Sequence, residues 1–160
     1  MSLVFLGSPW SLVLGPCWRD ILVAVSRFQD LVAWQRARLL ATEVYLATNE
    51  GQFSRDYGLA RQIRRSAVSV MANIAEGFAR NRTLEFQHYL DIARGSCAET
   101  HSHLYVALDV HYIDKPAFDR LEARCEEVGR TIRALRASIS SQQPPGPRTR
   151  DLKDPPGEGR

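Results

Sequence analysis

The chain has 160 residues, of which 44% are hydrophobic, and a net charge of +3. This size and composition are typical of one globular domain with a single core. The three cysteines, Cys17, Cys97 and Cys125, are odd in number and widely spaced, which excludes the disulfide framework of a small secreted domain. We therefore interpret them as reduced thiols in a cytoplasmic protein.

The two ends of the sequence differ from its middle. Residues 1–26 are apolar, but Pro9 and Pro16 interrupt any helix, no Lys or Arg precedes the apolar run, and the run is far shorter than the ~20 residues of a membrane span. We interpret this segment as an over-extended start, with the native protein beginning close to Phe28. Residues 141–160 are rich in Pro, Gly and charge, which predicts a disordered tail. The folded domain is expected over residues 27–140.

Charge is distributed unevenly along the domain. Residues 55–82 contain six arginines and two acids, a net charge of +4, whereas residues 83–127 contain nine acids and four basic residues, a net charge of −5. Such blocks can neutralise each other within one subunit or between subunits, and a basic block can instead bind phosphates. Two solvated faces of opposite charge are the simplest alternative.

Apolar residues recur at helical spacing in four long segments, and no alternation of apolar and polar residues predicts a strand. The first predicted helix spans residues 28–49, and the glycines at 51 and 58 mark the break after it. Its apolar residues include Leu31, Trp34, Leu40, Val44 and Tyr45. The second predicted helix spans residues 59–80, and its apolar stripe is Ile63, Ala67, Val70, Ile74 and Phe78.

The third predicted helix spans residues 84–112, with Thr83 as its N-cap and Glu85 in its first turn. The fourth begins after Lys115 and Pro116 and runs to residue 140, since proline is tolerated in a first helical turn. Both helices carry regular apolar seams, which are Phe86, Leu90, Ala93, Cys97, Thr100, Leu104, Ala107 and His111 in the third, and Phe118, Leu121, Cys125, Val128, Ile132, Leu135 and Ile139 in the fourth.

These segments predict an all-α fold. Short connections force sequential helices to lie antiparallel, so we expect an up-down-up-down antiparallel four-helix bundle. If the second and third helices fold back at residues 81–83, Arg64 and Arg65 lie level with Glu99 and Ala98. We predict that one of these arginines forms an ion pair with Glu99, within one subunit or across two.

The second and third predicted helices also carry a second stripe beside the apolar one. Small residues in it let helix backbones approach closely, and its polar side chains can form hydrogen bonds in a partly buried contact. We interpret the two stripes as a surface for self-association, and the alternative is a boundary between core and solvent. The stripes are Gln62, Ser66, Ser69, Asn73 and Arg80 on the second helix, and Glu85, Tyr89, Ile92, Ser96, Glu99, His103, Val106 and Val110 on the third.

Two isolated glycines, Gly77 and Gly95, lie inside these helical patterns. Each costs about 1 kcal/mol relative to alanine in a helix interior, so each is expected to permit close helix packing.

Five motifs occur in order along the predicted bundle. They are Phe28-x-x-Leu31-x-x-Trp34-Gln35, Gly58-Leu59-x-x-Gln62-Ile63-Arg64-Arg65, Ser69-x-x-x-Asn73-Ile74-Ala75-Glu76-Gly77, Glu85-Phe86, and Ala93-Arg94-Gly95-Ser96-x-x-Glu99. Their joint occurrence over residues 28–139 closely resembles the four helix bundle protein family, which is also named for intervening sequences in bacterial 23S ribosomal RNA genes.

The resemblance implies a fold, an assembly and partners. Members of the family are small bacterial proteins that look like up-down bundles assembled into homopentameric rings, without an established enzymatic activity. Relatives in diversity-generating retroelements serve as accessory proteins that bind a reverse transcriptase and nucleic acid. By position, Arg64 and Arg65 match the paired arginines of the family. Its other recognisable positions are matched by Asn73, Glu76, Gly77, Gly95, Ser96 and Glu99.

No catalytic constellation is found in the sequence, and we expect a protein that is not an enzyme. There is no Gly-rich phosphate loop and no Gly-x-Ser-x-Gly nucleophile motif. Cys97 and His101 share a helix face, but two ligands do not make a zinc site, and Glu85 with His88 lacks the second Glu-x-x-His motif of a di-iron bundle. We therefore expect no metal and no cofactor, and we interpret Cys97 and Cys125 as buried thiols.

The arginines of the second helix are the candidate residues for nucleic-acid binding: Arg61, Arg64, Arg65, Arg80 and Arg82. A ring repeats each cluster around its axis, and repeated phosphate contacts make binding strong and salt-sensitive. No aromatic residues are interleaved with these arginines, so we expect neither base stacking nor strong sequence preference. The candidates for subunit contacts or family positions are Gln62, Ser66, Ser69, Asn73, Glu76, Gly77, Gly95, Ser96 and Glu99.

Two functions follow from these candidates. The leading prediction is a homo-oligomer, expected to be a pentamer, that binds RNA or DNA, or a nucleic-acid enzyme such as a reverse transcriptase, without catalysis. The alternative is a structural or protein-interaction scaffold whose arginines form intersubunit salt bridges.

Overall fold

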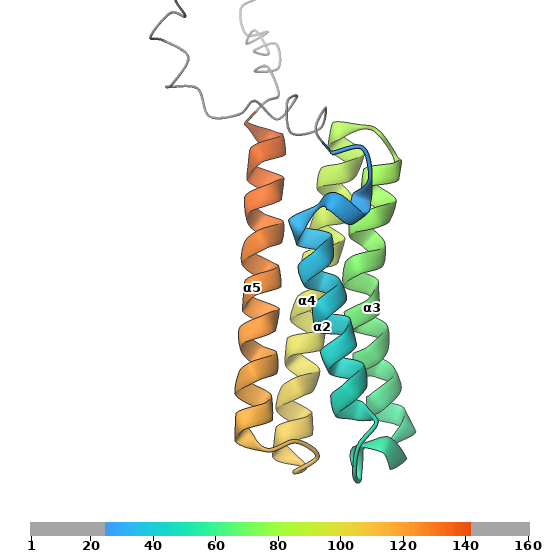
Figure 1. Cartoon of the computed structure of the whole chain (residues 1–160), viewed down its shortest axis with the longest axis vertical. Helices are drawn as coiled ribbons and strands as arrows, with labels where there is room; N and C mark the ends of the chain where they lie inside the picture. Colours follow the sequence, from blue (N-terminus) through green and yellow to red (C-terminus); the bar gives the residue numbers. More distant parts are fainter. Residues whose placement is uncertain (1–24, 142–160) are drawn as a thin grey trace, which may run out of the picture.

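The computed structural model describes residues 25–141 (Figure 1). Four long helices make up most of this part: α2 (Val32–Thr48), α3 (Tyr57–Ala79), α4 (Thr83–Asp109) and α5 (Lys115–Ser140). Two short 3-10 turns, η2 (Phe28–Asp30) and η3 (Phe53–Arg55), precede α2 and α3. No strand occurs among the described residues, so the prediction of an all-α fold with four helices is confirmed. The interpretations of the two ends of the chain lie outside the described residues, except at residues 25, 26 and 141.

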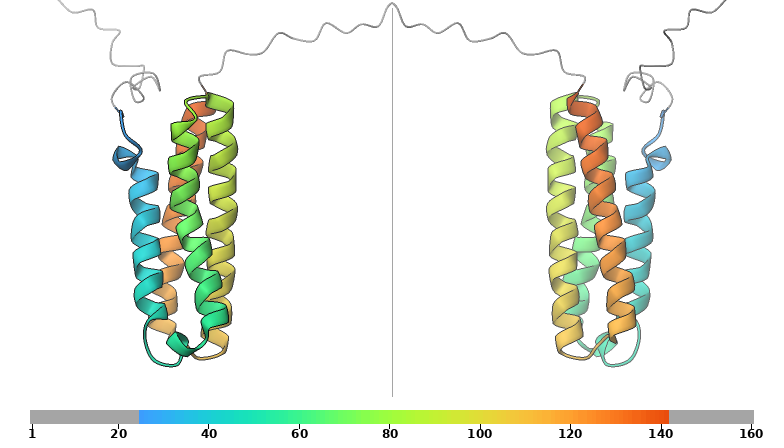
Figure 2. Two further views of the ribbon diagram at one scale, coloured as in Figure 1. Left: turned by 90° about the vertical axis from the view of Figure 1, so that its right-hand side faces the viewer. Right: turned by 90° about the vertical axis from the view of Figure 1, so that its left-hand side faces the viewer.

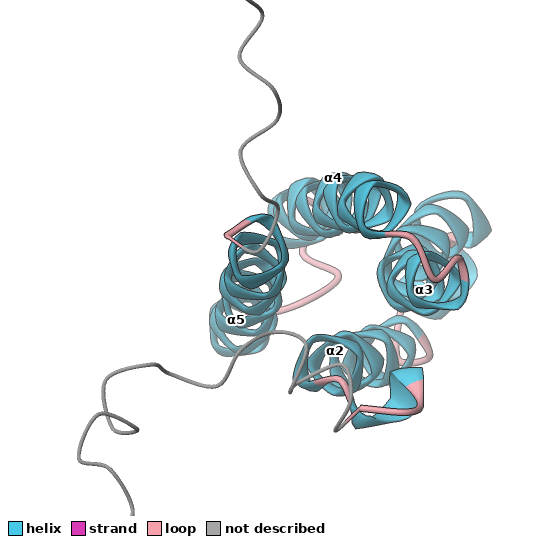
Figure 3. Cartoon of the chain, turned by 90° about the horizontal axis from the view of Figure 1, so that it is seen from above, coloured by secondary structure: helices cyan, strands magenta, loops and turns pink. Residues whose placement is uncertain are grey.

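The four helices lie side by side, and each packs against the helix before and after it in the sequence (Figure 1). The connections from α2 to α3 and from α4 to α5 lie at one end of the bundle, and the turn from α3 to α4 lies at the other (Figure 2). Seen from above, the helices surround the core in the order α2, α3, α4 and α5, with α5 beside α2 (Figure 3). As a result, α2 and α4 lie diagonally opposite each other.

Helix starts depend on short polar side chains at two of the four positions. Asp56 accepts a hydrogen bond from the backbone N–H of Leu59 and caps α3, and Asp114 accepts one from Ala117 and caps α5. Each aspartate satisfies a backbone donor that the first helical turn leaves without a partner. The predicted cap of α4 is wrong, because Thr83 is its first helical residue and extended Arg82 precedes it without a side-chain cap bond.

The first helix begins later than predicted. Residues 28–30 form a separate 3-10 turn, and Leu31 has an extended backbone (φ −72°, ψ 121°), so α2 begins at Val32. Phe28 packs edge to face against Trp34 with ring centroids 5.1 Å apart, and both rings lie against the core. The apolar spacing that predicted one continuous helix is therefore produced by a turn that packs its aromatic residue onto the helix that follows.

The predicted seams form the core. Their members on α3, α4 and α5 are buried with three exceptions: Phe78 and Leu135 are partly buried, and His111 is exposed. His111 follows the end of α4 and has a positive φ of 58°, so it no longer shares the helical face of the seam. Leu31, which precedes α2, and Leu40 and Val44 on α2 are buried, whereas Tyr45 is exposed.

The small residues of the second stripe lie between α3 and α4 of the same chain. Thr100 donates a hydrogen bond to the Ser66 hydroxyl at 2.9 Å, and the hydroxyl oxygens of Ser69 and Ser96 are 3.0 Å apart. Asn73 donates to the carbonyl and to the hydroxyl of Ser69. Ser66 is only 2% exposed and Ser96 only 8%. These small residues therefore belong to the contact of α3 with α4 within one chain, which neither the predicted subunit surface nor the alternative of a boundary between core and solvent describes.

The two glycines of the stripes have different surroundings. A Cβ added at Gly77 would lie 2.6 Å from the Cβ of Tyr89 and 2.9 Å from a ring carbon of Phe86, so Gly77 permits α3 and α4 to approach closely, as predicted. A Cβ added at Gly95 would meet nothing within 4 Å. The expectation of close packing at Gly95 is therefore wrong within one chain.

Residues 25–141 contain neither a candidate membrane span nor a candidate metal site. No helix there combines the length and the apolar composition needed to cross a membrane. In the same residues, no group of three or more His, Cys, Asp or Glu side chains is arranged so that it could hold a metal ion.

Candidate nucleic-acid interface

Three of the five candidate arginines lie together, where α2 ends and α3 begins. Arg61, Arg64 and Arg65 line an open groove of about 610 Å³, which we call the basic groove. Its remaining lining residues are Tyr45, Asn49, Ser54, Tyr57 and Ala60. The groove forms because the connection through η3 returns the chain against the last turn of α2, which places residues of both helices at one end of the bundle.

Arg64 is bonded to the end of α2. Its Nε donates to the hydroxyl of Thr48 at 2.6 Å, and its Nη2 donates to the Thr48 carbonyl at 2.8 Å and to Asn49 Oδ1 at 2.9 Å. Its guanidinium also lies 5.1 Å from the centre of the Tyr45 ring. A cation at the C-terminus of a helix meets carbonyl groups that lack helical partners and the negative end of the helix dipole. Arg64 therefore stabilises the junction of α2 and α3.

The predicted ion pair with Glu99 is absent within the chain. Arg64 is held by Thr48 and Asn49, and Glu99 lies 3.6 Å from His103 on its own helix. Arg65 has no ion pair or hydrogen bond within residues 25–141. The register of α3 against α4 differs from the predicted pairing by two to three residues. Ser66 contacts Thr100 where the prediction places Cys97, and Ser69 contacts Ser96 where it places Arg94. Pairing across two subunits stays a prediction.

Arg61 and Arg65 differ from Arg64 because both are exposed and neither forms an ion pair within the described chain. Only one ion pair, Arg82 with Glu85 at 3.3 Å, joins the basic block of residues 55–82 to the acidic block of residues 83–127 in the described part. Two acids of α5 pair with arginines on α2 or α5 instead: Glu127 pairs with Arg36 at 3.1 Å, and Glu126 pairs with Arg130 at 3.2 Å. The positive charge of the basic groove is therefore largely uncompensated within one chain.

Two tyrosines extend the basic groove, contrary to the expectation that no aromatic residue accompanies the arginines. Tyr57 is 81% exposed and precedes Arg61 by one helical turn, and Tyr45 is 43% exposed and comes from α2. The spacing of Tyr57 and Arg61 could be read from the sequence as neighbours on one helical face. The position of Tyr45 beside these arginines could not be read from the sequence, because it depends on how α2 and α3 pack.

Arg80 and Arg82 lie at the other end of the bundle, beside the turn from α3 to α4 (Figure 1). Arg61 and Arg80 are separated by about 28 Å along α3, since a helix rises 1.5 Å per residue. The five candidate arginines therefore form two separate clusters. Arg82 is exposed and pairs with Glu85, as described above.

Arg80 belongs to a surface triad with Glu76 and Tyr89. Arg80 donates to Glu76 at 2.7 Å and to the Tyr89 hydroxyl at 3.0 Å, and Tyr89 donates to Glu76 at 2.7 Å. The Tyr89 hydrogen bond and then the Arg80 hydrogen bond lower the pKa of Glu76, and the carboxylate raises the pKa of Tyr89. Arg80 is thus neutralised by Glu76, which makes it a weaker candidate for phosphate than Arg61 or Arg65.

Of the remaining candidates, Gln62 and Glu99 are exposed. Ser66, Ser69, Gly77 and Ser96 take part in the contact of α3 with α4. Asn73 is bonded to Ser69 on its own helix, and Glu76 takes part in the triad. Gly95 faces open space beside Glu99 on the outside of α4.

Comparison with known proteins identifies the family. Residues 29–134 match the family model described as 23S rRNA-intervening sequence protein. The chain is also similar to a crystal structure of a protein with unknown function from the S23 ribosomal protein family of Bacteroides thetaiotaomicron, with a TM-score of 0.60 and 21% identity, over 65% of this chain and 97% of that chain. At this identity the likeness shows the fold alone. No curated protein matches the sequence. Because the family model covers more than half of the chain, this protein belongs to the 23S rRNA-intervening sequence protein family.

Proposed function

We propose that this protein is a non-catalytic homo-oligomeric bundle of the cytoplasm that binds nucleic acid, or a nucleic-acid enzyme such as a reverse transcriptase, through the basic groove. The observation that carries the proposal is the pair of unpaired arginines, Arg61 and Arg65, beside the exposed ring of Tyr57. Arginine neutralises backbone phosphates, and an exposed aromatic ring stacks on an unpaired base. This combination favours a single strand over a duplex, because the bases of a duplex are already stacked.

One groove carries too little charge for tight binding. Several copies in one assembly would present several grooves, and simultaneous contacts raise the overall affinity far above that of one site. The proposed assembly is a homopentamer, as the family resemblance implies.

Exposed apolar stripes on α2 and α4 support self-association. Val32, Leu39 and Leu46 are exposed at intervals of seven residues along α2. Ile92 and Val106 on α4 and Val110 at its C-terminal end are exposed, and Gly95 on the same helix has open space where a side chain would be. Because α2 and α4 lie at opposite corners of the bundle, a contact of one stripe with the other joins copies head to tail. Such a contact builds a ring where the rotation between copies closes, and a filament where it does not.

The alternative function is a scaffold whose arginines form salt bridges between subunits. It is favoured by one specific observation: Arg65 on α3 and Glu99 on α4 are both exposed, and neither is bonded to the other within the chain. In a ring, these two residues of neighbouring copies would neutralise each other, and Arg65 would not be available to phosphate.

Binding of a fluorescent single-stranded oligonucleotide tests the proposal. We expect anisotropy to show binding that weakens steeply with salt and that is lost in the double variant Arg61→Gln/Arg65→Gln. The matched control is Arg38→Gln/Arg120→Gln, which removes two exposed arginines outside the basic groove and should retain binding.

Light scattering of the same two variants separates the two functions. If Arg61→Gln/Arg65→Gln loses the oligonucleotide but keeps the oligomer, nucleic-acid binding is supported. If the variant falls apart into smaller species while the control does not, the scaffold is supported. A monomeric wild-type protein would contradict both proposed functions, because each requires a homo-oligomer.

A further inference from the structure

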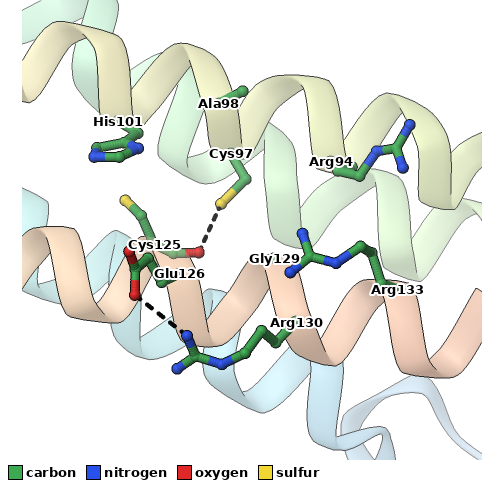
Figure 4. A pocket seen from close by; sticks show the side chains of 9 residues that line it. All are labelled: Arg94, Cys97, Ala98, His101, Cys125, Glu126, Gly129, Arg130 and Arg133. Atoms are coloured by element: carbon green, nitrogen blue, oxygen red, sulfur yellow. Dashed lines mark hydrogen bonds and ion pairs between the residues drawn. The ribbon is translucent and has the colours of Figure 1, made fainter.

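A second basic site lies between α4 and α5, away from the basic groove. A cavity of about 350 Å³ opens there, and three arginines line it: Arg94 from α4, and Arg130 and Arg133 from α5 (Figure 4). The floor contains Cys97 and Gly129. None of these arginines is among the candidates for nucleic-acid binding.

The charge of the cavity is only partly neutralised. Arg133 has no ion pair within residues 25–141, and its guanidinium extends along the cavity toward Gly129 (Figure 4). Arg94 is 3.8 Å from Asp91, but that carboxylate is already paired with Arg136 at 2.9 Å. Arg130 pairs with Glu126 at 3.2 Å. Two of the three arginines therefore keep most of their positive charge.

Gly129 keeps the cavity open. It is buried in the interior of α5, where glycine costs about 1 kcal/mol relative to alanine. No neighbouring backbone requires its small size, because the nearest atom to an added Cβ outside its own helical backbone is Arg133 Nη1 at 3.5 Å. The missing side chain instead leaves room for Arg133 and for a ligand beside it.

The charge of Arg133 also acts on the thiol at the floor of the cavity. Cys97 donates a hydrogen bond to the backbone carbonyl of Cys125 at 3.3 Å. Its interaction with Cys125 and, more weakly, the charge of Arg133 lower the pKa of the Cys97 thiol, whereas burial acts in the opposite direction. An anion in the cavity would therefore be stabilised by Arg133 in the same way as a thiolate.

We propose that this cavity binds a small phosphate-bearing anion, with Arg133 and Arg94 as its principal ligands. A guanidinium group donates two parallel hydrogen bonds to the oxygens of a phosphate, and two guanidinium groups from facing helices match the charge of a phosphate dianion. Arg130 contributes from the rim while it remains paired with Glu126. The ligand would bridge α4 and α5, which otherwise meet here across a cavity.

Inorganic phosphate is the probe for this proposal. Calorimetric titration at about pH 8, where the phosphate is a dianion, should show saturable binding at constant ionic strength, and acetate at the same ionic strength should show none. Arg133→Gln is expected to weaken binding by about tenfold or more, because it removes charged hydrogen bonds. The matched control is Arg120→Gln, an exposed arginine of the same helix outside the cavity.

Two further variants locate the site. Gly129→Leu fills the cavity and should abolish phosphate binding, with circular dichroism used to verify that the helices are retained. Arg61→Gln/Arg65→Gln, which changes only the basic groove, should leave phosphate binding unchanged. The proposal would be overturned if Arg120→Gln weakened phosphate binding as much as Arg133→Gln does, or if Arg133→Gln left phosphate binding unchanged. It would also be overturned if the wild type bound acetate as well as it binds phosphate. None of these results depends on whether the basic groove binds nucleic acid.

Discussion

Arg64 on α3 donates three hydrogen bonds to the last residues of α2, two of them to Thr48. The Thr48 hydroxyl itself donates to the carbonyl of Val44 at 2.8 Å, so a fully buried side chain connects Arg64 to the preceding helical turn. Arg64 and Arg65 are adjacent in sequence, but only one of them is used in this way. Arg64 therefore holds α2 and α3 together, whereas Arg65 is available to a partner.

Arg64→Ala is expected to lower the free energy of unfolding by about 1–3 kcal/mol, because it leaves the Thr48 and Asn49 oxygens without their donor. Arg65→Ala should change it by less than about 0.5 kcal/mol, because its side chain is exposed and unpaired. Urea unfolding followed by circular dichroism measures both. Equal losses for the two variants would contradict the distinction between them.

The two helix glycines are expected to respond to alanine in opposite directions. Gly77→Ala brings a Cβ within 2.6 Å of Tyr89 Cβ and should reduce the free energy of unfolding by about 1–3 kcal/mol through overpacking. Gly95→Ala meets open space and should increase it by about 0.8–1 kcal/mol through helix propensity. Urea unfolding of monomeric protein at low concentration measures both. A destabilising Gly95→Ala would contradict the open space at this position.

The helices and most of the core could be predicted because the helical spacing of apolar residues marks, within each segment, the face that is buried. Ile63, Val70 and Ile74 follow the seam spacing on α3, and all are buried as predicted. Partners across helices could not be predicted in this way. The bond from Arg64 to Thr48 depends on how the connection through η3 returns the chain, and a spacing rule contains no information about that path.

The second stripe shows the same limit. Its small residues did indicate a close contact, but one sequence cannot say whether the facing helix belongs to the same chain or to another. Ser66 and Thr100 are hydrogen-bonded within the chain, which resolves this for the inner part of the stripe. Gly95 and Ile92 on the outside of α4 retain the features of a contact surface without a partner in the described chain.

The triad of Glu76, Arg80 and Tyr89 predicts a defined dependence on pH. The pKa of Glu76 is lowered, so its contribution to stability is present above the ordinary value of 4.5 and is lost as the pH falls through the folded pKa. The pKa of Tyr89 is raised, so its contribution to stability is present below pH 10.0 and is lost as the pH rises through the folded pKa.

Tyr89→Phe should move the pKa of Glu76 back toward its ordinary value, as measured by NMR titration of the carboxyl carbon. The wild type and Tyr89→Phe should have the same free energy of unfolding at pH values below the pKa of Glu76. A difference that persists at such pH values would not come from the hydrogen bond to Glu76 and would contradict the prediction.

Tyr57 is the residue that distinguishes stacking on bases from simple attraction of phosphates. Tyr57→Ala should weaken binding of a single-stranded oligonucleotide by about 5-fold to 150-fold, since base stacking on an aromatic side chain contributes about 1–3 kcal/mol. Tyr57→Phe keeps the ring and should bind as the wild type does. The side chain is 81% exposed, so both variants should unfold at the wild-type urea concentration, which makes the binding result independent of folding.

An abasic strand of the same length is the control, because it carries the same phosphates without bases. Tyr57→Ala and the wild type should bind this strand with equal affinity. Equal binding of the normal strand by these two proteins would leave Arg61 and Arg65 as purely electrostatic contacts and exclude stacking by Tyr57.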